Sequence, residues 1–465
     1  MGRTAVVAVA GLTRALLARL PRLGRWAAGR QTAAIEPLLP AVTCSAQATY
    51  LTGRPPSEHG IVANGWYCAE ECEIKFWHQC SRLVQAPRLW DIARYSDPDF
   101  TCANLFWCHN MYATVDVSIT PRPMCPADGR KIPDIYTQPA GLRDQLQAEL
   151  GRFPLSDFWG PRASIRASVW IAAAAQRVDA LFLPSLSLVY LPHLDYCLQR
   201  RGPQGTIERD LADIDTLAAE LIEFYEGRGV RVVLLSEYGV APVSRAVPLN
   251  WHLRDEGYVA VREELGRELL DAGASRAFAV ADHQLAHVYV RDPADLRAVR
   301  SLLEAVPGVD RAYARQELPH LNHPRSGDLI AVAEREAWFS YYYWHDERKA
   351  PDFARTVDGQ RKPGYDPAEL MFDPAIPFPA LKIAWRRLQQ RLGLRTVFDL
   401  VPVHGDLVRG SHGRTDAPAA ELPVIVGEDL ARREAAIPAT AVLDVLLDQV
   451  FGGYRAPGRQ ARRAA

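Results

Sequence analysis

Short apolar runs alternate with longer helical segments along this chain, and that alternation limits its fold more than any other feature. The runs are of strand length and span 6–10, 181–191 and 230–235. Each is followed by a polar, turn-like segment. Strands separated by helices are typical of βαβ units, in which helices cover both faces of a parallel sheet. The sequence therefore predicts an α/β fold with a doubly wound, mostly parallel sheet.

Ligand sites in such sheets lie beyond the carboxyl ends of the strands. In this chain the segments in that place are 10–12, 192–195 and 236–239. We therefore expect functional residues in these three segments.

The chain has 465 residues, 48% of them hydrophobic, which is enough to bury a large core. We expect a core over 1–425 with two inserts. The first, at about 66–161, is rich in Trp, Pro, Cys and Tyr and has few periodic elements. The second, at about 257–318, is predicted as a small α+β subdomain of strand, helix and strand. Residues 426–465 are expected to form a C-terminal helix and a basic, disordered tail.

The charge balance argues against some partners. Lys and Arg total 54 against 55 Asp and Glu, so the net charge is −1. Such a chain has no long-range attraction to a nucleic-acid polymer or an anionic membrane, although local patches can exist. The first apolar run is too short for a signal peptide, and no run reaches ~18 apolar residues. We expect a cytoplasmic protein with neither a nucleic-acid polymer nor a membrane as partner; the oligomeric state is left open.

Two other segments could bind a ligand or only pack. The aromatic run 338–344 could stack a base or a sugar, but such runs more often belong to a core or a lid. His283 and His287 are four residues apart, which on a helix would place them on one face. We predict a strand over 278–290, where that spacing is ~13 Å, so both histidines are expected to be structural.

The segment PAVTCSAQATYLTGRPPSEHGIVAN, residues 40–64, carries the most specific pattern in the chain. A threonine stands nine residues before a Thr-Gly pair, and Pro-x-x-His-Gly-Ile and an asparagine follow. The positions are Thr43, Thr52-Gly53, Pro56, His59-Gly60-Ile61 and Asn64. This pattern resembles the nucleophile region of the type I phosphodiesterases/nucleotide pyrophosphatases, a branch of the alkaline phosphatase superfamily.

The resemblance implies that Thr43 attacks phosphorus and that Asn64 holds a non-bridging phosphoryl oxygen. A threonine hydroxyl is a weak nucleophile until a metal or a base takes its proton. A helix that starts just after Thr43 would direct backbone N–H groups and the positive end of its dipole at a phosphate. Without the downstream pattern, the same residues would be interpreted as a helix cap and a loop.

Further matches extend the resemblance from residue 6 to about 425. Residues 188–195 with Gly202-Pro203 lie where the branch has Pro-Asp-x-x-Gly-His-x-x-Gly-Pro. Residues 236–239 lie where it has Ser-Asp-His-Gly, and 410–414 look like its last His-Gly motif.

The resemblance also implies metals, but the ligand pattern is altered. Members of the branch usually hold two divalent ions, commonly zinc, with three Asp, three His and the Thr. Here Ala10 stands at the first Asp and cannot bind a metal, and Tyr238 replaces a His with a phenol whose ordinary pKa is near ~10. Glu237 replaces an Asp, and His193 stands where another Asp is expected.

The ligand set that remains is His193, Asp195, Glu237 and His412, with Thr43 as the ligand to be activated. Nitrogen and oxygen ligands suit zinc best, with manganese as an alternative. One ion, two ions or none stay open.

These features predict a metal-dependent hydrolase of a phosphodiester, a pyrophosphate or a related phosphoryl or phosphonate substrate. Thr43 would form a covalent intermediate that water then hydrolyses. One alternative is a metal-depleted, non-catalytic scaffold that binds a phosphorylated metabolite or a partner. Another is transfer of the phosphoryl group to an acceptor other than water.

Overall fold

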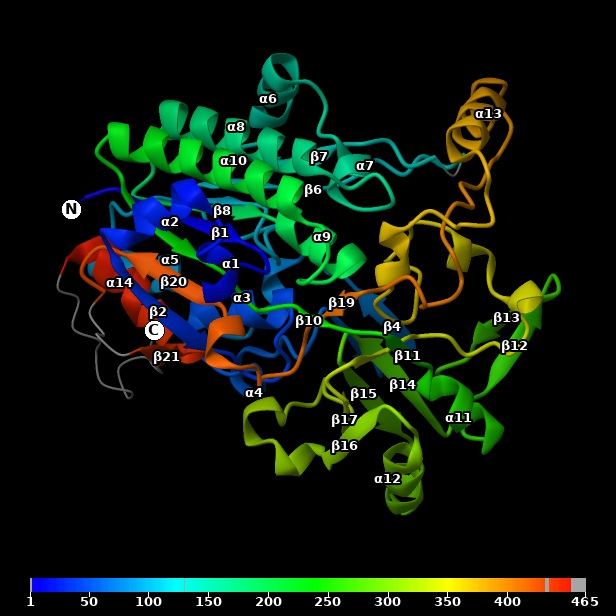
Figure 1. Cartoon of the computed structure of the whole chain (residues 1–465). Helices are drawn as coiled ribbons and strands as arrows, with labels where there is room; N and C mark the ends of the chain where they lie inside the picture. Colours follow the sequence, from blue (N-terminus) through cyan, green and yellow to red (C-terminus); the bar gives the residue numbers. More distant parts are fainter. Residues whose placement is uncertain (1, 129, 431–434, 453–465) are drawn as a thin grey trace.

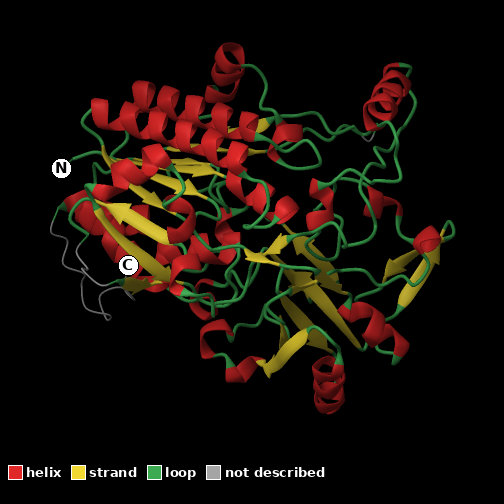
Figure 2. Ribbon diagram, in the orientation of Figure 1, coloured by secondary structure: helices red, strands yellow, loops and turns green. Residues whose placement is uncertain are grey.

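A nine-stranded mixed sheet forms the centre of the larger unit (Figures 1 and 2). The computed structural model describes residues 2–128, 130–430 and 435–452, so the basic tail expected over 455–465 lies outside the described residues. The strand order is β21 (Ala436–Pro438), β2 (Gln31–Glu36), β20 (Val424–Gly427), β9 (Arg231–Leu235), β1 (Thr4–Val9), β8 (Leu186–Leu191), β5 (Cys102–Leu105), β6 (Val117–Pro121) and β7 (Ile135–Gln138).

The middle of this sheet confirms the predicted α/β class. β1 lies between β8 and β9 and is parallel to both. All six residues of β1 are buried, because helices cover both faces of the sheet. Helices α8 (Ile165–Phe182) and α10 (Glu208–Gly227) pack on one face, and α3 (Thr43–Thr52), α5 (Leu89–Ser96) and α14 (Val442–Phe451) lie on the other (Figure 1).

Two predicted segments differ from the structure. The apolar run 181–191 does not form one strand, because α8 continues to Phe182 and β8 begins only at Leu186. Leu183 ends the helix in the left-handed conformation, with φ 47°. The segment 66–161, expected as an insert, contributes β5, β6 and β7 to one edge of the central sheet. These strands are short and largely buried, so neither length nor alternation reveals them.

A second sheet of four antiparallel strands forms a smaller unit beside the first (Figure 2). Its order is β14 (Ala277–Asp282), β15 (Leu285–Val290), β17 (Leu329–Ala333) and β16 (Val309–Ala314), and α11 (Leu249–Asp255) and α12 (Leu296–Ala305) pack on it. The predicted single strand 278–290 is in fact a hairpin. The apolar pattern continues on both sides of the two-residue turn His283-Gln284, so periodicity alone does not show the turn.

The remaining elements are short helices and two-stranded pairs. The helices are α1 (Arg14–Leu17), α2 (Pro21–Ala28), α4 (Pro56–His59), α6 (Leu142–Leu150), α7 (Leu155–Phe158), α9 (His193–Arg201) and α13 (Pro379–Arg391). The pairs are β3 (Gly65–Cys68) with β4 (Glu73–Phe76), β10 (Ala241–Pro242) with β19 (Gly410–Ser411), β11 (Arg245–Val247) with β18 (Ala337–Phe339), and β12 (Val261–Glu264) with β13 (Arg267–Leu270). In the described parts of the chain, no helix combines the length and the apolar character that a bilayer-spanning segment needs.

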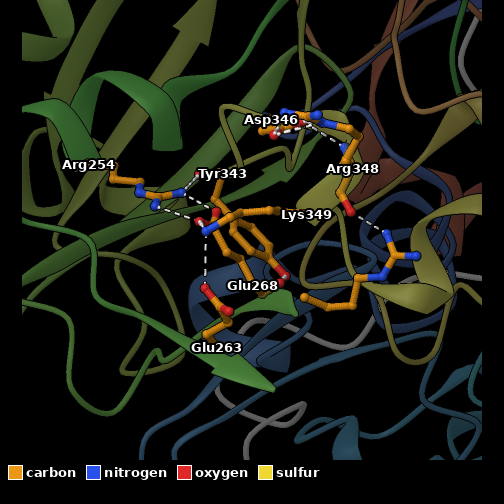
Figure 3. Close-up of polar contacts among 8 residues, drawn as sticks. Arg254, Glu263, Glu268, Tyr343, Asp346, Arg348 and Lys349 are labelled. Carbon is orange, nitrogen blue, oxygen red and sulfur yellow. Dashed lines mark hydrogen bonds and ion pairs between the residues drawn. The ribbon is translucent and has the colours of Figure 1, made fainter. Parts of the chain in front are cut away.

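The aromatic side chains of residues 339–344 pack in the core of the smaller unit, whereas Trp338 packs with Val243 and Val408. A polar cluster fixes the end of the run (Figure 3). Arg254 donates to both carboxylate oxygens of Glu268, at 2.6 and 3.1 Å, and to the Tyr343 carbonyl at 2.8 Å. These bonds to Arg254 lower the pKa of Glu268. Lys349 lies 3.1 Å from the exposed Glu263 at the rim of the cluster.

We expect Glu268→Ala to lower the free energy of unfolding by about 2 kcal/mol, because Arg254 would be left largely buried without its carboxylate. The matched control is Glu263→Ala, which removes only an exposed ion pair and should cost less than about 0.5 kcal/mol. Urea denaturation followed by tryptophan fluorescence measures both. Equal costs for the two variants would contradict the role given to the Arg254 pair.

Candidate active site

The carboxyl ends of β1, β8 and β9 meet the start of α3, and the predicted nucleophile lies there. Thr43 is the first residue of α3, after Val42 in extended conformation. The first N–H groups of a helix have no partners inside the helix, and the helix dipole is positive at this end. Thr43 is buried but retains 7% of its surface exposed. Its hydroxyl therefore stands at a helix end that favours an anion.

Asn64 is held in one orientation beside this helix end. Its side-chain oxygen accepts a hydrogen bond from the Cys44 N–H at 3.0 Å. Its Nδ2 donates to Oδ1 of Asp282 at 3.0 Å, and its backbone N–H donates to Oδ2 at 2.8 Å. Asp282 comes from β14, so the smaller unit positions a residue of the site. Sequence reasoning missed Asp282, which lies 218 residues from Asn64.

Tyr238 contacts both the nucleophile and the last histidine of the predicted set. Its hydroxyl lies 3.2 Å from the Thr43 Oγ1. Its ring stacks on His412 with centroids 3.6 Å apart and an angle of 7° between the planes. A Cβ at Gly239 would lie 2.0 Å from the Glu421 carbonyl oxygen, so the turn after Tyr238 requires glycine. Tyr238 is thus fixed where the family resemblance led us to expect a metal-binding histidine.

Asp195 lies close to the same phenol. Its Oδ2 accepts a hydrogen bond of 2.6 Å from Gln199, whose own Oε1 accepts from the Tyr365 hydroxyl at 2.8 Å. Burial raises the pKa of Asp195 to about 7, although Gln199 and the nearby Tyr238 hydroxyl both oppose that rise. Asp195 can therefore carry or release a proton near neutral pH.

The sequence already held the signal that Asp195, and not His193, matches the family motif. The motif Asp-x-x-Gly-His-x-x-Gly-Pro places its Asp seven residues before the Gly-Pro, and Asp195 stands seven residues before Gly202-Pro203. The same count places Gln199 at the motif's histidine. Aligning on the preceding proline instead gave His193 the role of the Asp.

His193 is not brought together with the other predicted residues. It begins α9, and its Nε2 faces Oδ1 of Asp210 on α10 at 3.4 Å. Burial lowers the pKa of His193, which favours the neutral ring. Thr43, Asn64, Asp195 and His412, by contrast, are linked through direct contacts or one intervening residue, and Glu237 is bonded to α3 through Gln47.

Glu237 and His412 complete the group. Gln47, on α3, donates to Oε1 of Glu237 at 2.8 Å, and burial raises the pKa of Glu237 to about 7. His412 Nδ1 lies 2.8 Å from the Ala41 carbonyl, and its Nε2 lies 4.0 Å from Oδ1 of Asp195. Burial lowers the pKa of His412 to about 3, so the ring is neutral at physiological pH. The turn residue His283, predicted as structural only, lies with its ring 3.6 Å from that of His412.

These residues do not fit the two-ion centre that the family resemblance implies. Three positions lack a good ligand, namely Ala10, Gln199 and Tyr238. Neutral donors bond the remaining carboxylates: Gln199 bonds Asp195 and Gln47 bonds Glu237. Each carboxylate keeps one oxygen without a hydrogen bond, but its raised pKa allows a proton to neutralise it. In the described ranges, no three His, Cys, Asp or Glu side chains are grouped to hold a metal.

Comparison with known families and solved structures indicates a phosphoryl hydrolase of the alkaline phosphatase superfamily. The model of one family, type I phosphodiesterase / nucleotide pyrophosphatase, matches residues 4–366, which is most of the chain. The chain therefore belongs to that family, whose members generally depend on divalent metals. A search of curated proteins found no match.

Solved structures share the fold at low sequence identity. Murine ectonucleotide pyrophosphatase/phosphodiesterase 5, as an inactive variant with AMP, is 14% identical with a TM-score of 0.59, over 100% of this chain and 99% of that chain. The human protein of the same name is 14% identical with a TM-score of 0.59, over 99% of this chain and 98% of that chain. Phosphonoacetate hydrolase from Sinorhizobium meliloti, with phosphonoformate, is 15% identical with a TM-score of 0.60, over 97% of this chain and 96% of that chain. These similarities extend over nearly the whole of each chain.

Proposed function

We propose that this chain hydrolyses a phosphodiester, a pyrophosphate or a related phosphonate, with Thr43 as the nucleophile. The observation that carries this proposal is the Thr43 hydroxyl at the start of α3, 3.2 Å from the Tyr238 hydroxyl. Family membership supports the reaction class. AMP and phosphonoformate are bound in the neighbouring structures, which supports a small phosphorylated or phosphonate substrate here.

The attacked phosphoryl group would lie against the start of α3. One hydrogen of the Asn64 Nδ2 is used by Asp282, and an amide nitrogen carries two. We assign the second hydrogen to a non-bridging phosphoryl oxygen. The positive end of the helix dipole adds to this stabilisation where negative charge increases in the transition state.

The Thr43 proton has a path through Tyr238. As the Thr43 oxygen forms its bond to phosphorus, its proton passes to the Tyr238 oxygen, and the phenolic proton passes to Asp195. Asp195 is suited to this step because its pKa of about 7 lets it be ionised before the step and protonated after it. Tyr238 remains a neutral phenol, which is favoured because burial raises its pKa.

The bond from phosphorus to the leaving oxygen, or to carbon in a phosphonate, breaks as Thr43 becomes covalently attached. The leaving group takes the proton from Asp195, which is ionised again. A water molecule then attacks phosphorus and gives its proton to Asp195, and a proton returns through Tyr238 to the Thr43 oxygen as its bond to phosphorus breaks. Two displacements regenerate the enzyme with no net change in its protonation.

Family resemblance alone implies a divalent ion, zinc or manganese, but the residues present do not fit one, and no step above depends on it. We expect elemental analysis of the purified chain to give well below one such ion per chain, because amide and phenol donors occupy the ligand positions. Hydrolysis of an aryl phosphodiester should accordingly survive dialysis against a chelator.

A variant that restores the family's ligand types provides the matched control. Ala10→Asp with Gln199→His and Tyr238→His is expected to retain zinc through purification. Stoichiometric zinc in the unmodified chain, together with turnover that is lost on chelation and regained with zinc, would contradict the proposed proton path.

A non-catalytic scaffold that binds a phosphorylated ligand is the second candidate. The observation that favours it is the mutual hydrogen bonding of the site's polar side chains, which can persist without a metal or a reaction. Tight AMP binding without release of aryl alcohol from an aryl phosphodiester, or of phosphate from a pyrophosphate, would favour the scaffold over the hydrolase.

A further inference from the structure

Helix α13 extends away from both sheets (Figure 1). None of its residues is buried. Of the fifteen large apolar side chains that the described chain exposes, seven lie between residues 378 and 397. Such a concentration of exposed apolar surface marks an interaction site, because soluble proteins otherwise expose large apolar side chains singly.

Four of these side chains form one continuous face of α13. Leu381, Trp385, Leu388 and Leu392 are spaced by four, three and four residues, the spacing of one side of a helix. Their exposed fractions are 68%, 57%, 46% and 69%. A stripe of this kind normally faces the protein core, whereas here it faces away from it.

The helix and its flanks are basic. From residue 374 to 398 the chain has five Lys or Arg residues and no Asp or Glu. Lys382 and Arg386 bind Asp399, at 2.8 and 3.0 Å, and so attach the helix to the loop that follows it. Arg387 and Arg391 are exposed and have no ion-pair partner among the residues that the structure describes.

These two arginines line a cavity beside the apolar stripe. The cavity has a volume of about 700 Å³, and Arg162 contributes a third guanidinium to its wall. Phe372, Ile383 and Leu388 supply apolar walls. Cationic and apolar groups thus line the same space, which matches a ligand with an anionic head and hydrocarbon chains.

We propose that α13 binds the surface of an anionic phospholipid membrane peripherally. We call Leu381, Trp385, Leu388 and Leu392 with Arg387 and Arg391 the α13 patch. Leucine and tryptophan side chains enter the boundary between headgroups and acyl chains, while arginines bind lipid phosphates. A second copy docked symmetrically through α13 would cover the apolar stripe but would bring no carboxylate from that helix to the arginines, because residues 374–398 contain no Asp or Glu. The net charge of −1 led us to expect no membrane partner. That charge is a sum over the whole chain, so it does not show a local basic patch.

Co-sedimentation with vesicles tests the proposal on the full chain. The chain is expected to bind vesicles of phosphatidylcholine mixed equally with phosphatidylglycerol. Its binding to vesicles of phosphatidylcholine alone should be weaker by about tenfold or more. The variant Leu381→Ser/Trp385→Ser should lower binding to the mixed vesicles by about tenfold or more. The variant Arg387→Gln/Arg391→Gln should lower it as well and should reduce its dependence on salt.

The matched control is Tyr95→Ser/Leu265→Ser, which removes two still more exposed apolar side chains elsewhere and should bind as the unmodified chain does. Circular dichroism confirms that all variants fold. Equal binding by the control and the α13 variants, or binding that ignores lipid charge, would overturn the proposal. So would a dimer in gel filtration that Leu381→Ser/Trp385→Ser dissociates, with no vesicle binding. None of these outcomes depends on the chemistry at Thr43.

Discussion

Replacing Thr43 by alanine is expected to lower the turnover of an aryl phosphodiester by about 10³-fold or more, because no other group can form the covalent bond to phosphorus. The substitution removes a hydroxyl and a methyl group at the first position of α3, so the fold should persist. Steady-state release of the aryl alcohol measures the effect. Thr43→Ser, which keeps the hydroxyl, should retain activity within about tenfold of the unmodified chain.

Thr52→Ala is the matched control in the same helix. The Thr52 hydroxyl donates to the Ala48 carbonyl at 2.7 Å, at the opposite end of α3 from Thr43. Its loss should change stability more than turnover. Full activity in Thr43→Ala, or an equal loss in Thr52→Ala, would show that the reaction does not pass through the Thr43 oxygen.

Replacing Tyr238 by phenylalanine is expected to lower turnover by about 10²-fold, because the ring still stacks on His412 while the proton path from Thr43 to Asp195 is broken. Asp195→Asn should cost as much. In the unmodified chain, kcat should rise with pH through about 7, since Asp195 must be ionised to accept the proton. Glu237 titrates in the same range, so this limb belongs to the two carboxylates together.

Tyr50→Phe is the matched control for the phenol. The Tyr50 hydroxyl donates to the Ser236 and Glu237 carbonyls at 3.1 and 3.3 Å, and no contact joins it to Thr43. The Tyr50→Phe variant should keep the rise of kcat with pH that the unmodified chain shows. If Tyr238→Phe left both kcat and its pH dependence unchanged, Tyr238 would be excluded as the proton carrier.

The predicted site residues that the structure places side by side belong to short local patterns. Thr43 and Asn64 lie in one segment of 25 residues, and the chain between them forms the helix and turns that bring them together. The α/β fold class could also be predicted from the sequence, because buried parallel strands such as β1 are continuous apolar runs. Both conclusions depend on residues close in sequence.

The residues that the sequence did not predict depend on distant contacts or on register. Asp282 and His283 enter the site from a hairpin more than 200 residues after Thr43, and no local pattern marks that hairpin as part of the site. Gln199 was not predicted because the family motif can be aligned with this segment in two ways, either on the proline at its start or on Gly202-Pro203 at its end. The hydrogen bond from Gln199 to Asp195 decides in favour of the second anchor.

The altered ligands themselves could be identified from sequence, but their consequence could not. Ala10 and Tyr238 show only that ligands are missing. The structure adds that Tyr238 makes a new contact with Thr43, and that Gln47 and Gln199 bond the carboxylates that remain. We propose that these hydrogen bonds take the place of the metal ligands that the family resemblance implies.

The most direct test is acid quenching of the enzyme during turnover of an aryl phosphodiester, followed by mass spectrometry of its peptides. We predict a phosphoryl adduct on the peptide that contains Thr43, at Thr43 itself, and its absence in Thr43→Ala. An adduct on another residue, or steady turnover with no adduct at any quench time, would contradict the assignment of Thr43 as the nucleophile.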